Sequence, residues 1–412
     1  MRIAYQCVTC RHSFDSEEVV YECPRCLASG EAGRAGEGHP HGYLSVVCAP
    51  PSGLRPGGPV ATSDFLPFPT GDLPAWPVGN TPLVSPARLR EKTGIPGLFF
   101  KNDTLNPSGS LKDRASLLVA AQAMARGEKR IALASTGNAG ASMACAGAAF
   151  GLEIILFVPA AAPRAKLLQS LLYGARVVPV KGTYDDAFSL SLAYTKRFGG
   201  INRNTGYNPL TVEGKKTVAI ELYNQLACRV PDIVYVPTGD GVIYSGTCKG
   251  FADLVKAGCA DRVPMVVPVQ ARGSNAIARS WREGSEVTLS RTDTVADSLS
   301  VGRPASGQMA LGFLRRTGAR IVEVSDREIG AAQAELAAQA GLFVEPSSAV
   351  AWAGFLADRP NLDPASKVVV LLTGTGFKDT GAAEKLVEMP APCAADVESA
   401  ARFLADVYGL PA

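Results

Sequence analysis

Over residues 76–385, short apolar runs rich in β-branched residues alternate with longer stretches rich in alanine and leucine. The short runs have the length of strands, and the longer ones have the length of helices. Continuous apolar strands between helices predict parallel sheets covered on both faces, which is an α/β fold. Such sheets bind ligands at the carboxyl ends of their strands, so we expect the functional residues there. The predicted strands are Ile154–Val158, Arg176–Val180, Asp232–Val236, Met265–Val269 and Val368–Leu372, and the predicted helices are Lys112–Arg126, Thr136–Phe150, Asp185–Arg197 and Asp326–Ala340.

Residues 1–48 form a separate N-terminal module that carries two pairs of cysteines. Cys7 and Cys10 make the first pair, Cys23 and Cys26 the second, and twelve residues separate the pairs. Two such pairs place four thiolates for tetrahedral zinc, as in a zinc ribbon. A four-cysteine site has no open coordination position, so the zinc would stabilise the fold rather than react. A ribbon without metal is the alternative. The module also carries several acidic residues, which argues against nucleic acid as a partner.

The segments that flank the predicted core carry weaker patterns. Residues 49–75 are rich in proline and glycine, which is typical of a linker that wraps or spans. Residues 386–412 contain apolar side chains at helical spacing. We expect this C-terminal stretch to form a helix that packs on the core and has no catalytic role.

Charge and histidine content exclude several classes of function. The formal net charge of +3 is too small to indicate a nucleic-acid-binding protein. All three histidines lie at or before residue 41, so the core cannot use a Ser/His/Asp or Cys/His arrangement. The N-terminus has no apolar signal segment, and glycines and Glu153 interrupt the longest apolar stretch, residues 143–163. We therefore expect a cytoplasmic protein without a membrane partner, whose chemistry comes from lysine, carboxylates, hydroxyls, thiols or a bound cofactor.

Lys112 is the first candidate catalytic residue. Asn106–Gly109 has the composition of a turn, and Ser110 is a plausible N-cap for a helix that starts at Leu111. Lys112 then lies in the first turn of that helix, where the helix dipole disfavours a cation. The lysine is either solvated at the surface or chemically neutralised, for instance as a Schiff base. This segment alone leaves both interpretations open.

Three loops that follow predicted strands can hold an anion or a ring. Residues 135–142 and 237–246 are rich in glycine and small residues and open helices, so their backbone N–H groups can face a phosphate. The second loop lacks the G-x-G-x-x-G spacing, which argues against a nicotinamide dinucleotide. Residues 213–217 resemble the end of a nucleotide-binding phosphate loop, but residue 209 is proline where that motif needs glycine. Thr373 ends a predicted strand, where its hydroxyl can meet a ring nitrogen or cap a turn.

Together these segments make the chain resemble the fold-type II pyridoxal-phosphate enzymes of the tryptophan synthase β-like superfamily, and most of all the threonine synthase family. The resemblance implies two three-layer α/β/α subdomains with pyridoxal 5′-phosphate between them, the smaller one covering about residues 115–230, in a chain that is commonly a homodimer. An N-terminal zinc-ribbon-like segment also occurs in such proteins. The matching segments are Gly79–Leu83, Asn106–Arg114, Ser135–Ser142, Asn208–Thr217, Gly239–Phe251, Val301–Ala310, Glu345–Ala349 and Leu372–Asp379.

The same resemblance implies roles for single residues. Lys112 would form the Schiff base with the cofactor and later move protons, Asn138 would bond the cofactor's 3′-oxygen, and Thr373 would meet the pyridine nitrogen. A hydroxyl partner does not stabilise a protonated ring nitrogen, which suits elimination and replacement better than transamination. The backbone expected to hold the 5′-phosphate is that of Gly239, Asp240, Gly241, Val242 and Ile243, and the residues expected at the substrate carboxylate are Ser135, Thr136 and Ala139.

In the family, the substrate is O-phospho-L-homoserine, which needs a second phosphate pocket. Lys101 matches a family lysine that faces this pocket, and Asn208 opens a segment whose arginine grips the phosphate. Here Thr211 stands at the arginine position, which removes a strong bidentate contact. Arg303 either supplies the missing charge from another loop or lies at the surface. Leu111 and Thr375 are further departures, because the family commonly has phenylalanine and histidine there.

Three functions follow as hypotheses. The first is threonine synthase activity, in which phosphate leaves Cγ and water adds at Cβ. The second is a related lyase or replacement enzyme that acts on O-phosphoserine, serine or threonine, similar to cysteate synthase or an ammonia-lyase, and Thr211 is its support. The third is a catalytically silent cofactor-binding or zinc-ribbon interaction protein. The presence of Lys112, Asn138 and Thr373 counts against the third.

Overall fold

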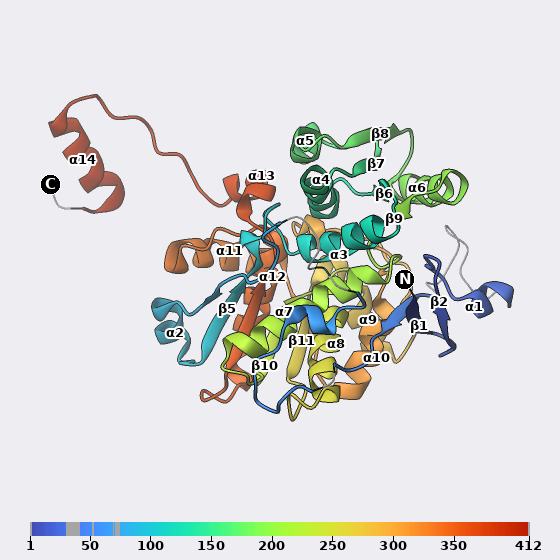
Figure 1. Cartoon of the computed structure of the whole chain (residues 1–412). Helices are drawn as coiled ribbons and strands as arrows, with labels where there is room; N and C mark the ends of the chain where they lie inside the picture. The colour runs from blue at the N-terminus through green and yellow to red at the C-terminus, as the bar shows by residue number, and fades with distance from the viewer. Residues whose placement is uncertain (1, 30–41, 52, 69, 71–74, 411–412) are drawn as a thin grey trace.

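Two parallel sheets, each covered by helices, make up most of the chain (Figure 1). The computed structural model describes residues 2–29, 42–51, 53–68, 70 and 75–410. The larger sheet has the strand order β12-β11-β10-β13-β5-β4, and its strands are parallel except for the edge strand β4. Its strands are β4 (Leu83–Val84), β5 (Leu98–Asn102), β10 (Ile233–Pro237), β11 (Met265–Ala271), β12 (Val322–Val324) and β13 (Val368–Leu372).

The smaller sheet is all parallel, with the order β8-β7-β6-β9. Its strands fall within residues 130–202 and are β6 (Arg130–Ala134), β7 (Glu153–Pro159), β8 (Arg176–Val180) and β9 (Ile201–Asn202). The α/β class predicted from the sequence is confirmed. The core helices are α2 (Ala87–Thr93), α3 (Lys112–Ala125), α4 (Asn138–Phe150), α5 (Arg164–Leu172), α6 (Tyr184–Phe198), α7 (Leu210–Gln225), α8 (Val242–Lys256), α9 (Ala276–Glu283), α10 (Gly307–Thr317), α11 (Asp326–Ala340) and α12 (Pro346–Asp358).

The central strands of the sheets are buried on both faces, which explains why they are almost entirely apolar. In β10, Val234 and Val236 pack in one apolar cluster with α7 and α8, whereas Ile233 and Tyr235 pack on the opposite face with α12. The smaller sheet repeats this arrangement, with α3 and α4 over one face and α6 over the other. Successive strand residues point to opposite faces, so one strand serves two separate cores.

Helix α7 was not predicted as a helix, and it is the most enclosed helix in the core. Every residue from Leu210 to Tyr223 is buried, so its sequence shows no apolar and polar faces. Glycines let the neighbouring helices approach it closely. A Cβ on Gly214 would lie 2.3 Å from the Arg114 carbonyl oxygen of α3, and a Cβ on Gly250 would lie 2.4 Å from the Lys216 carbonyl oxygen facing α8. Because α7 is enclosed by α3 and α8, its polar side chains must find partners within the protein or its ligands.

The described residues of the N-terminal module form an antiparallel three-stranded sheet with one short helix. Its elements are β1 (Ile3–Cys7), β2 (Ser13–Ser16), α1 (Pro24–Ala28) and β3 (Leu44–Val47). The ring of Tyr21 stacks on that of Tyr207 with 4.9 Å between centroids, and its hydroxyl accepts a hydrogen bond from the Asn202 backbone. The predicted linker is fixed to the core as well, because Val60 exchanges two backbone hydrogen bonds with the Asn224 side chain.

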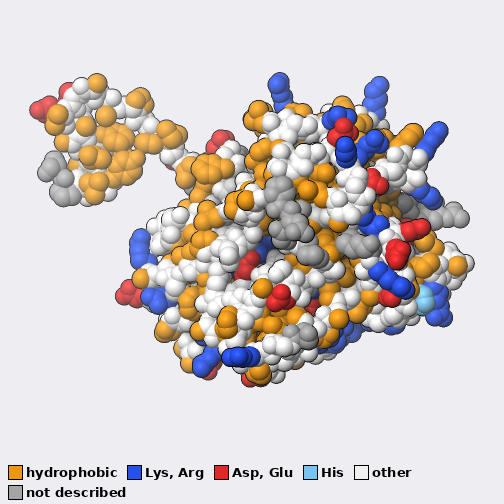
Figure 2. All heavy atoms as spheres, viewed as in Figure 1, with side chains coloured by type: hydrophobic (Ala, Val, Ile, Leu, Met, Phe, Trp, Pro, Cys, Tyr) orange, Lys and Arg blue, Asp and Glu red, His pale blue; other side chains and the backbone are white. Residues whose placement is uncertain are grey.

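The C-terminal stretch departs from the prediction. A helix, α14 (Val397–Tyr408), does form, and Asp396 caps it. However, none of its residues is buried, so the expectation that it packs on the core is wrong for this structure. Figure 1 shows it beyond α13 (Thr380–Glu384), at the end of an extended segment, and Figure 2 shows apolar side chains on its surface. Among the described residues, no helix is long and apolar enough to cross a membrane.

Candidate active site

A cavity of about 440 Å³ lies where the carboxyl ends of β6 and β10 meet the start of α3. The α3 lysine, Lys112, lines it together with the loop that opens α4 and the loop that opens α8. This is the position that parallel sheets give to ligands, as the sequence predicted. The predicted site residues that line the cavity are Lys112, Ser135, Thr136, Asn138, Ala139, Gly239, Asp240, Ile243 and Arg303.

The backbone beside Lys112 is tied to the end of β13. The Leu111 N–H donates to the Thr373 carbonyl oxygen at 2.8 Å, and Ser110 forms a bridge with Gly374. The Thr373 N–H donates to the Ser348 hydroxyl at 2.9 Å at the start of α12. Thr373 is buried beside Lys112, although it is not among the residues that line the cavity. These backbone contacts between residues 110–111 and 373–374 bring the predicted lysine and threonine close together.

The Lys112 amine has a lowered pKa. Burial is the largest cause, and the nearby Arg203 charge adds to it, while the carboxylates of Asp240 and Glu345 partly oppose it. A lowered pKa increases the share of free amine near neutral pH, which a nucleophilic or proton-transferring lysine needs. Burial also raises the pKa of Glu345, although hydrogen bonds from Asn138 at 2.8 and 3.1 Å favour its charged form.

The glycine loop at the start of α8 is packed closely against residues 299–306. A Cβ on Gly239 would lie 2.9 Å from Leu299 Cα, and Gly241 has a φ of +82°. Asp240 Oδ1 accepts a hydrogen bond from the Val242 N–H at 2.9 Å and so closes the turn that leads into the helix. Val242 and Gly241 are buried behind the residues that line the cavity. A backbone held this close to the cavity, at a helix N-terminus, fits a phosphate group.

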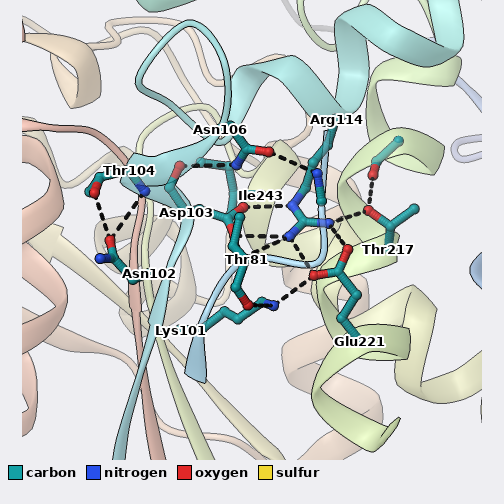
Figure 3. Close-up of polar contacts among 12 residues, drawn as sticks. Thr81, Lys101, Asn102, Asp103, Thr104, Asn106, Arg114, Thr217, Glu221 and Ile243 are labelled. Atoms are coloured by element: carbon teal, nitrogen blue, oxygen red, sulfur yellow. Dashed lines mark hydrogen bonds and ion pairs between the residues drawn. The ribbon is translucent and has the colours of Figure 1, made fainter. Parts of the chain in front are cut away.

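Lys101 does not lie at the cavity, which corrects the prediction of a substrate contact. Its ammonium group donates to Glu221 Oε2 at 2.6 Å, to the Thr81 carbonyl oxygen at 2.7 Å and to Gln225 at 3.0 Å. Arg114 binds the same Glu221 and, on its other side, Asp103 (Figure 3). This buried group, which we call the α3–α7 ion network, consists of Thr81, Lys101, Asp103, Arg114, Thr217 and Glu221.

The side chains of Asn208 and Thr211 likewise form hydrogen bonds within the chain. The Thr211 hydroxyl donates to the Asn208 carbonyl oxygen at 2.7 Å and accepts from the Gly206 N–H at 3.0 Å. The Asn208 side chain bonds Asn202 and Leu210 in the same turn. Neither residue lines the cavity. These hydrogen bonds hold the turn at the start of α7, and the substrate contacts expected of both residues stay predictions.

Several residues of the cavity wall were not predicted from the sequence. Glu22 and Tyr43 come from the N-terminal module, and Tyr207 donates a hydrogen bond to Glu22 at 3.4 Å. Tyr184 and Phe188 come from α6. The two cysteine pairs could not have signalled this, because they predict the module's fold and not the surface it covers. The N-terminal module thus supplies part of the wall of the cavity.

The four cysteines of that module come together as predicted. Their sulfur atoms all lie within 4.8 Å of one another, and the Cys7–Cys26 and Cys10–Cys23 sulfurs are 3.7 Å apart. Thiolates bound to one zinc ion at about 2.3 Å lie about 3.8 Å apart in a tetrahedron. The donor set and its spacing therefore fit a structural zinc ion.

Comparison with known proteins agrees with this geometry. Residues 77–374 match the family of pyridoxal-phosphate dependent enzymes, and the chain belongs to that family. Within it, the chain is 31% identical over 408 residues to a threonine synthase of Methanosarcina acetivorans, covering 96% of both chains. It is 34% identical over 336 residues to a threonine synthase of Methanocaldococcus jannaschii, covering 80% of this chain and 82% of the relative.

Solved structures share the fold. Threonine deaminase isoform 2 from Solanum lycopersicum superposes with a TM-score of 0.66 at 21% identity, covering 82% of this chain and 92% of that one. A fungal L-serine ammonia-lyase from Rhizomucor miehei gives a TM-score of 0.65 at 25% identity, covering 75% and 97%. These likenesses confirm the fold-type II architecture that the motifs predicted.

Proposed function

We propose that this chain converts O-phospho-L-homoserine and water to L-threonine and phosphate by γ-elimination and β-replacement. The observation that carries the proposal is the match to threonine synthases along almost the whole chain, together with a cavity that Lys112 lines. Pyridoxal 5′-phosphate supplies an electron sink for the bonds around the substrate's Cα. The residues available to hold it are Lys112, Asn138, Thr373 and the backbone of Gly239–Ile243.

The chain's own groups carry the proton transfers. The Lys112 amine, with its pKa lowered by burial, takes a proton from Cα and returns one later. The loop 135–139 receives the substrate carboxylate at the N-terminus of α4, where the helix dipole favours an anion. The Ser135 hydroxyl accepts a hydrogen bond from the Gly140 N–H at 3.1 Å, which ties the start of this loop to the first turn of α4.

We also propose that Cys7, Cys10, Cys23 and Cys26 hold one structural zinc ion, which keeps Glu22 and Tyr43 in the cavity wall. Metal analysis of the purified protein should find about one zinc per chain. Removal by a chelator should loosen the module and weaken substrate binding more than cofactor binding. A protein purified without metal, with unchanged kinetics, would contradict this assignment.

The activity is tested by incubating the cofactor-loaded protein with O-phospho-L-homoserine while phosphate release is measured and the amino-acid product is identified. We expect threonine and phosphate in equal amounts. The Lys112→Ala variant should lose about 10²–10⁴-fold in rate, since the proton-transferring amine is gone. No phosphate release from a protein that shows the visible absorbance of bound cofactor would refute the proposed reaction.

One observation favours a second candidate. Thr211 replaces the family's phosphate-binding arginine, and its hydroxyl is used in the turn before α7. A β-elimination or β-replacement enzyme acting on O-phosphoserine, serine or threonine would not need that arginine. Assays with O-phosphoserine plus sulfite, and then with free serine and threonine, separate this candidate from the first. A protein that binds cofactor and turns over none of these substrates would be catalytically silent.

A further inference from the structure

Arg203 and Lys215 are buried cations that lack acidic partners. Both side chains belong to residues that are 0% exposed. The Lys215 ammonium group has no hydrogen-bond partner within the described chain, and neither do Nε and Nη2 of Arg203. Cations are almost never fully buried unless they are paired, because removal from water is costly. Two such groups in one protein indicate that an anionic ligand completes them.

Both cations are packed against elements that contribute residues to the cavity wall. Arg203 follows β9, at the carboxyl end of the smaller sheet, and its Nη1 donates to the hydroxyl of Thr205, which lines the cavity. Lys215 lies on α7, and its Cβ is 3.0 Å from the place of a Cβ on Gly246. Gly246 is in the second turn of α8, the helix that the loop 239–243 opens. The two cations therefore approach the same region from different elements.

The charges around this region do not balance. Burial, together with the positive charges of Lys112 and Arg203, holds the pKa of Lys215 well below its ordinary value. Burial also lowers the pKa of Arg203 to about 10. Asp240 is the carboxylate that opposes the shift in all three of Lys112, Arg203 and Lys215. Asp113 and Tyr184 add to it only for Arg203. Glu345 opposes the shift of Lys112 as well, but among the described residues none of these carboxylates is hydrogen-bonded to Arg203 or Lys215, so both cations are available to an anionic ligand.

Lys215 also lies near the position at which the family has its phosphate-binding arginine. Residues 211 and 215 are four apart on α7, so they lie on the same side of the helix, one turn from each other. The family's cation at 211 is threonine here, and a buried, unpaired lysine appears one turn further on. A cation thus lies one helical turn from the position at which the family resemblance leads us to expect one.

We propose that Arg203 and Lys215 bind the phosphate group of a phosphorylated amino-acid substrate and replace the arginine that is absent at Thr211. This inference rests on the proposed function for the identity of the substrate. Arg203 offers two free N–H donors in a planar fork, which matches two phosphate oxygens, and Lys215 offers a point charge. The cofactor's phosphate is the other possible source of the same chemistry, and the experiment separates the two.

The experiment measures binding of inorganic phosphate to the holoenzyme by calorimetry, and binding of pyridoxal phosphate to the cofactor-free protein by its absorbance. Both are measured for the wild type, Lys215→Gln, Arg203→Gln and the control Lys216→Gln. Lys216 neighbours Lys215 and is equally buried, but it is paired with carboxylates. If Lys216→Gln does not fold, Lys249→Gln serves as the control, since Lys249 meets the same carboxylates.

We expect the two test variants to bind inorganic phosphate about 10- to 100-fold more weakly, the range for a lost charge-assisted contact. Their affinity for pyridoxal phosphate should stay within about threefold of the wild type, and the control should change neither affinity by more than that. Weaker cofactor binding with unchanged phosphate binding would overturn the proposal and assign the cations to the cofactor. Unchanged binding of both, or no phosphate binding by the wild type, would also overturn it.

The readout does not depend on turnover, so it is independent of the proposed function. If the wild type binds phosphate through Arg203 and Lys215 but leaves O-phospho-L-homoserine intact, the pair is supported and the proposed substrate is wrong. O-phosphoserine is then the substrate to test, because it presents the same group. If the wild type produces threonine while both variants keep the wild-type KM, the proposed function stands and the pair is refuted.

Discussion

Two adjacent lysines on α7 have the same burial and opposite surroundings. Lys216 contacts Glu213 at 2.7 Å and Asp253 at 2.9 Å. Burial alone would lower its pKa, but these carboxylates outweigh burial and raise it. Lys215 has no acidic partner within hydrogen-bond distance, and its pKa is well below the ordinary value. Of these two neighbouring lysines on an enclosed helix, Lys216 therefore stabilises the fold, whereas Lys215 is available to bind a ligand.

The same division extends across the molecule. In the α3–α7 ion network, Arg114 meets carboxylates on both sides, and Lys101 shares one of them (Figure 3). At the cavity, Lys112, Arg203 and Lys215 share the influence of Asp240. Removing one partner of a buried ion pair lowers the stability of the fold, whereas an unpaired buried charge itself lowers stability until a ligand binds it. Substitutions in the two groups should therefore change the free energy of unfolding by different amounts.

The largest expected effect is in the paired group. Arg114→Met should destabilise the protein by about 3–5 kcal/mol, since it leaves Asp103 and Glu221 buried with fewer partners. Urea unfolding of the wild type and the variant measures this. Arg114→Lys is the control for charge, and we expect it to recover only part of the loss because lysine cannot bind both carboxylates in a planar fork. A variant as stable as the wild type would show that Arg114 does not stabilise the fold through these carboxylates.

Acid should unfold the protein through the same network. Burial would raise the pKa of Glu221, but Arg114 and Lys101 outweigh it and lower the pKa to about 2. A carboxyl with a lowered pKa stabilises the fold fully above its ordinary value of 4.5, and this contribution is lost as the pH falls toward 2. The loss should reach about 3 kcal/mol, measured by urea unfolding over that range. Glu221→Gln should show a flatter dependence.

Much of the fold was accessible from the sequence. The five predicted strands and four predicted helices all occur, with ends that differ by at most two residues. Helix α7 was missed because it is enclosed on all sides, so burial removes the periodicity that identifies a helix. The C-terminal helix was predicted from its apolar spacing, but spacing says nothing about whether a partner surface exists within the chain.

The site was less accessible for a different reason. Lys112, Asn138 and the loop 239–243 lie in segments that the chain's own strands and turns make recognisable. Lys101 looked like a ligand residue, but it pairs with Glu221, which is 120 residues away in sequence. Arg203 and Lys215 left no sequence signal, since a cation is distinctive only when the absence of its partner is known. Long-range pairing decides both cases.

A smaller loss is expected at Lys216. Lys216→Gln should lower the free energy of unfolding by about 1–3 kcal/mol, less than the removal of Arg114. The reason is that Lys249 remains 3.0 Å from Glu213 and 3.3 Å from Asp253, so both carboxylates keep one cation. Urea unfolding again measures the change. The double variant with Lys249→Gln should lose more than the two single changes added together, because neither carboxylate then has a lysine partner.

The smallest expected effect is at Lys215. Lys215→Gln should leave stability unchanged or raise it by up to about 1 kcal/mol in phosphate-free buffer, because it removes an unpaired buried charge.

The destabilisation caused by the buried Lys215 charge depends on pH. A lysine whose pKa is lowered on folding opposes the fold most at low pH, and this opposition fades as the pH approaches the ordinary value of 10.5. The advantage of Lys215→Gln over the wild type should therefore shrink between neutral pH and about pH 10. Urea unfolding at several pH values tests this. Lys216→Gln is the comparison, since it should change the free energy of unfolding in the opposite direction. If both variants lose stability alike, the two lysines are equivalent, and the distinction between paired and unpaired cations on α7 fails.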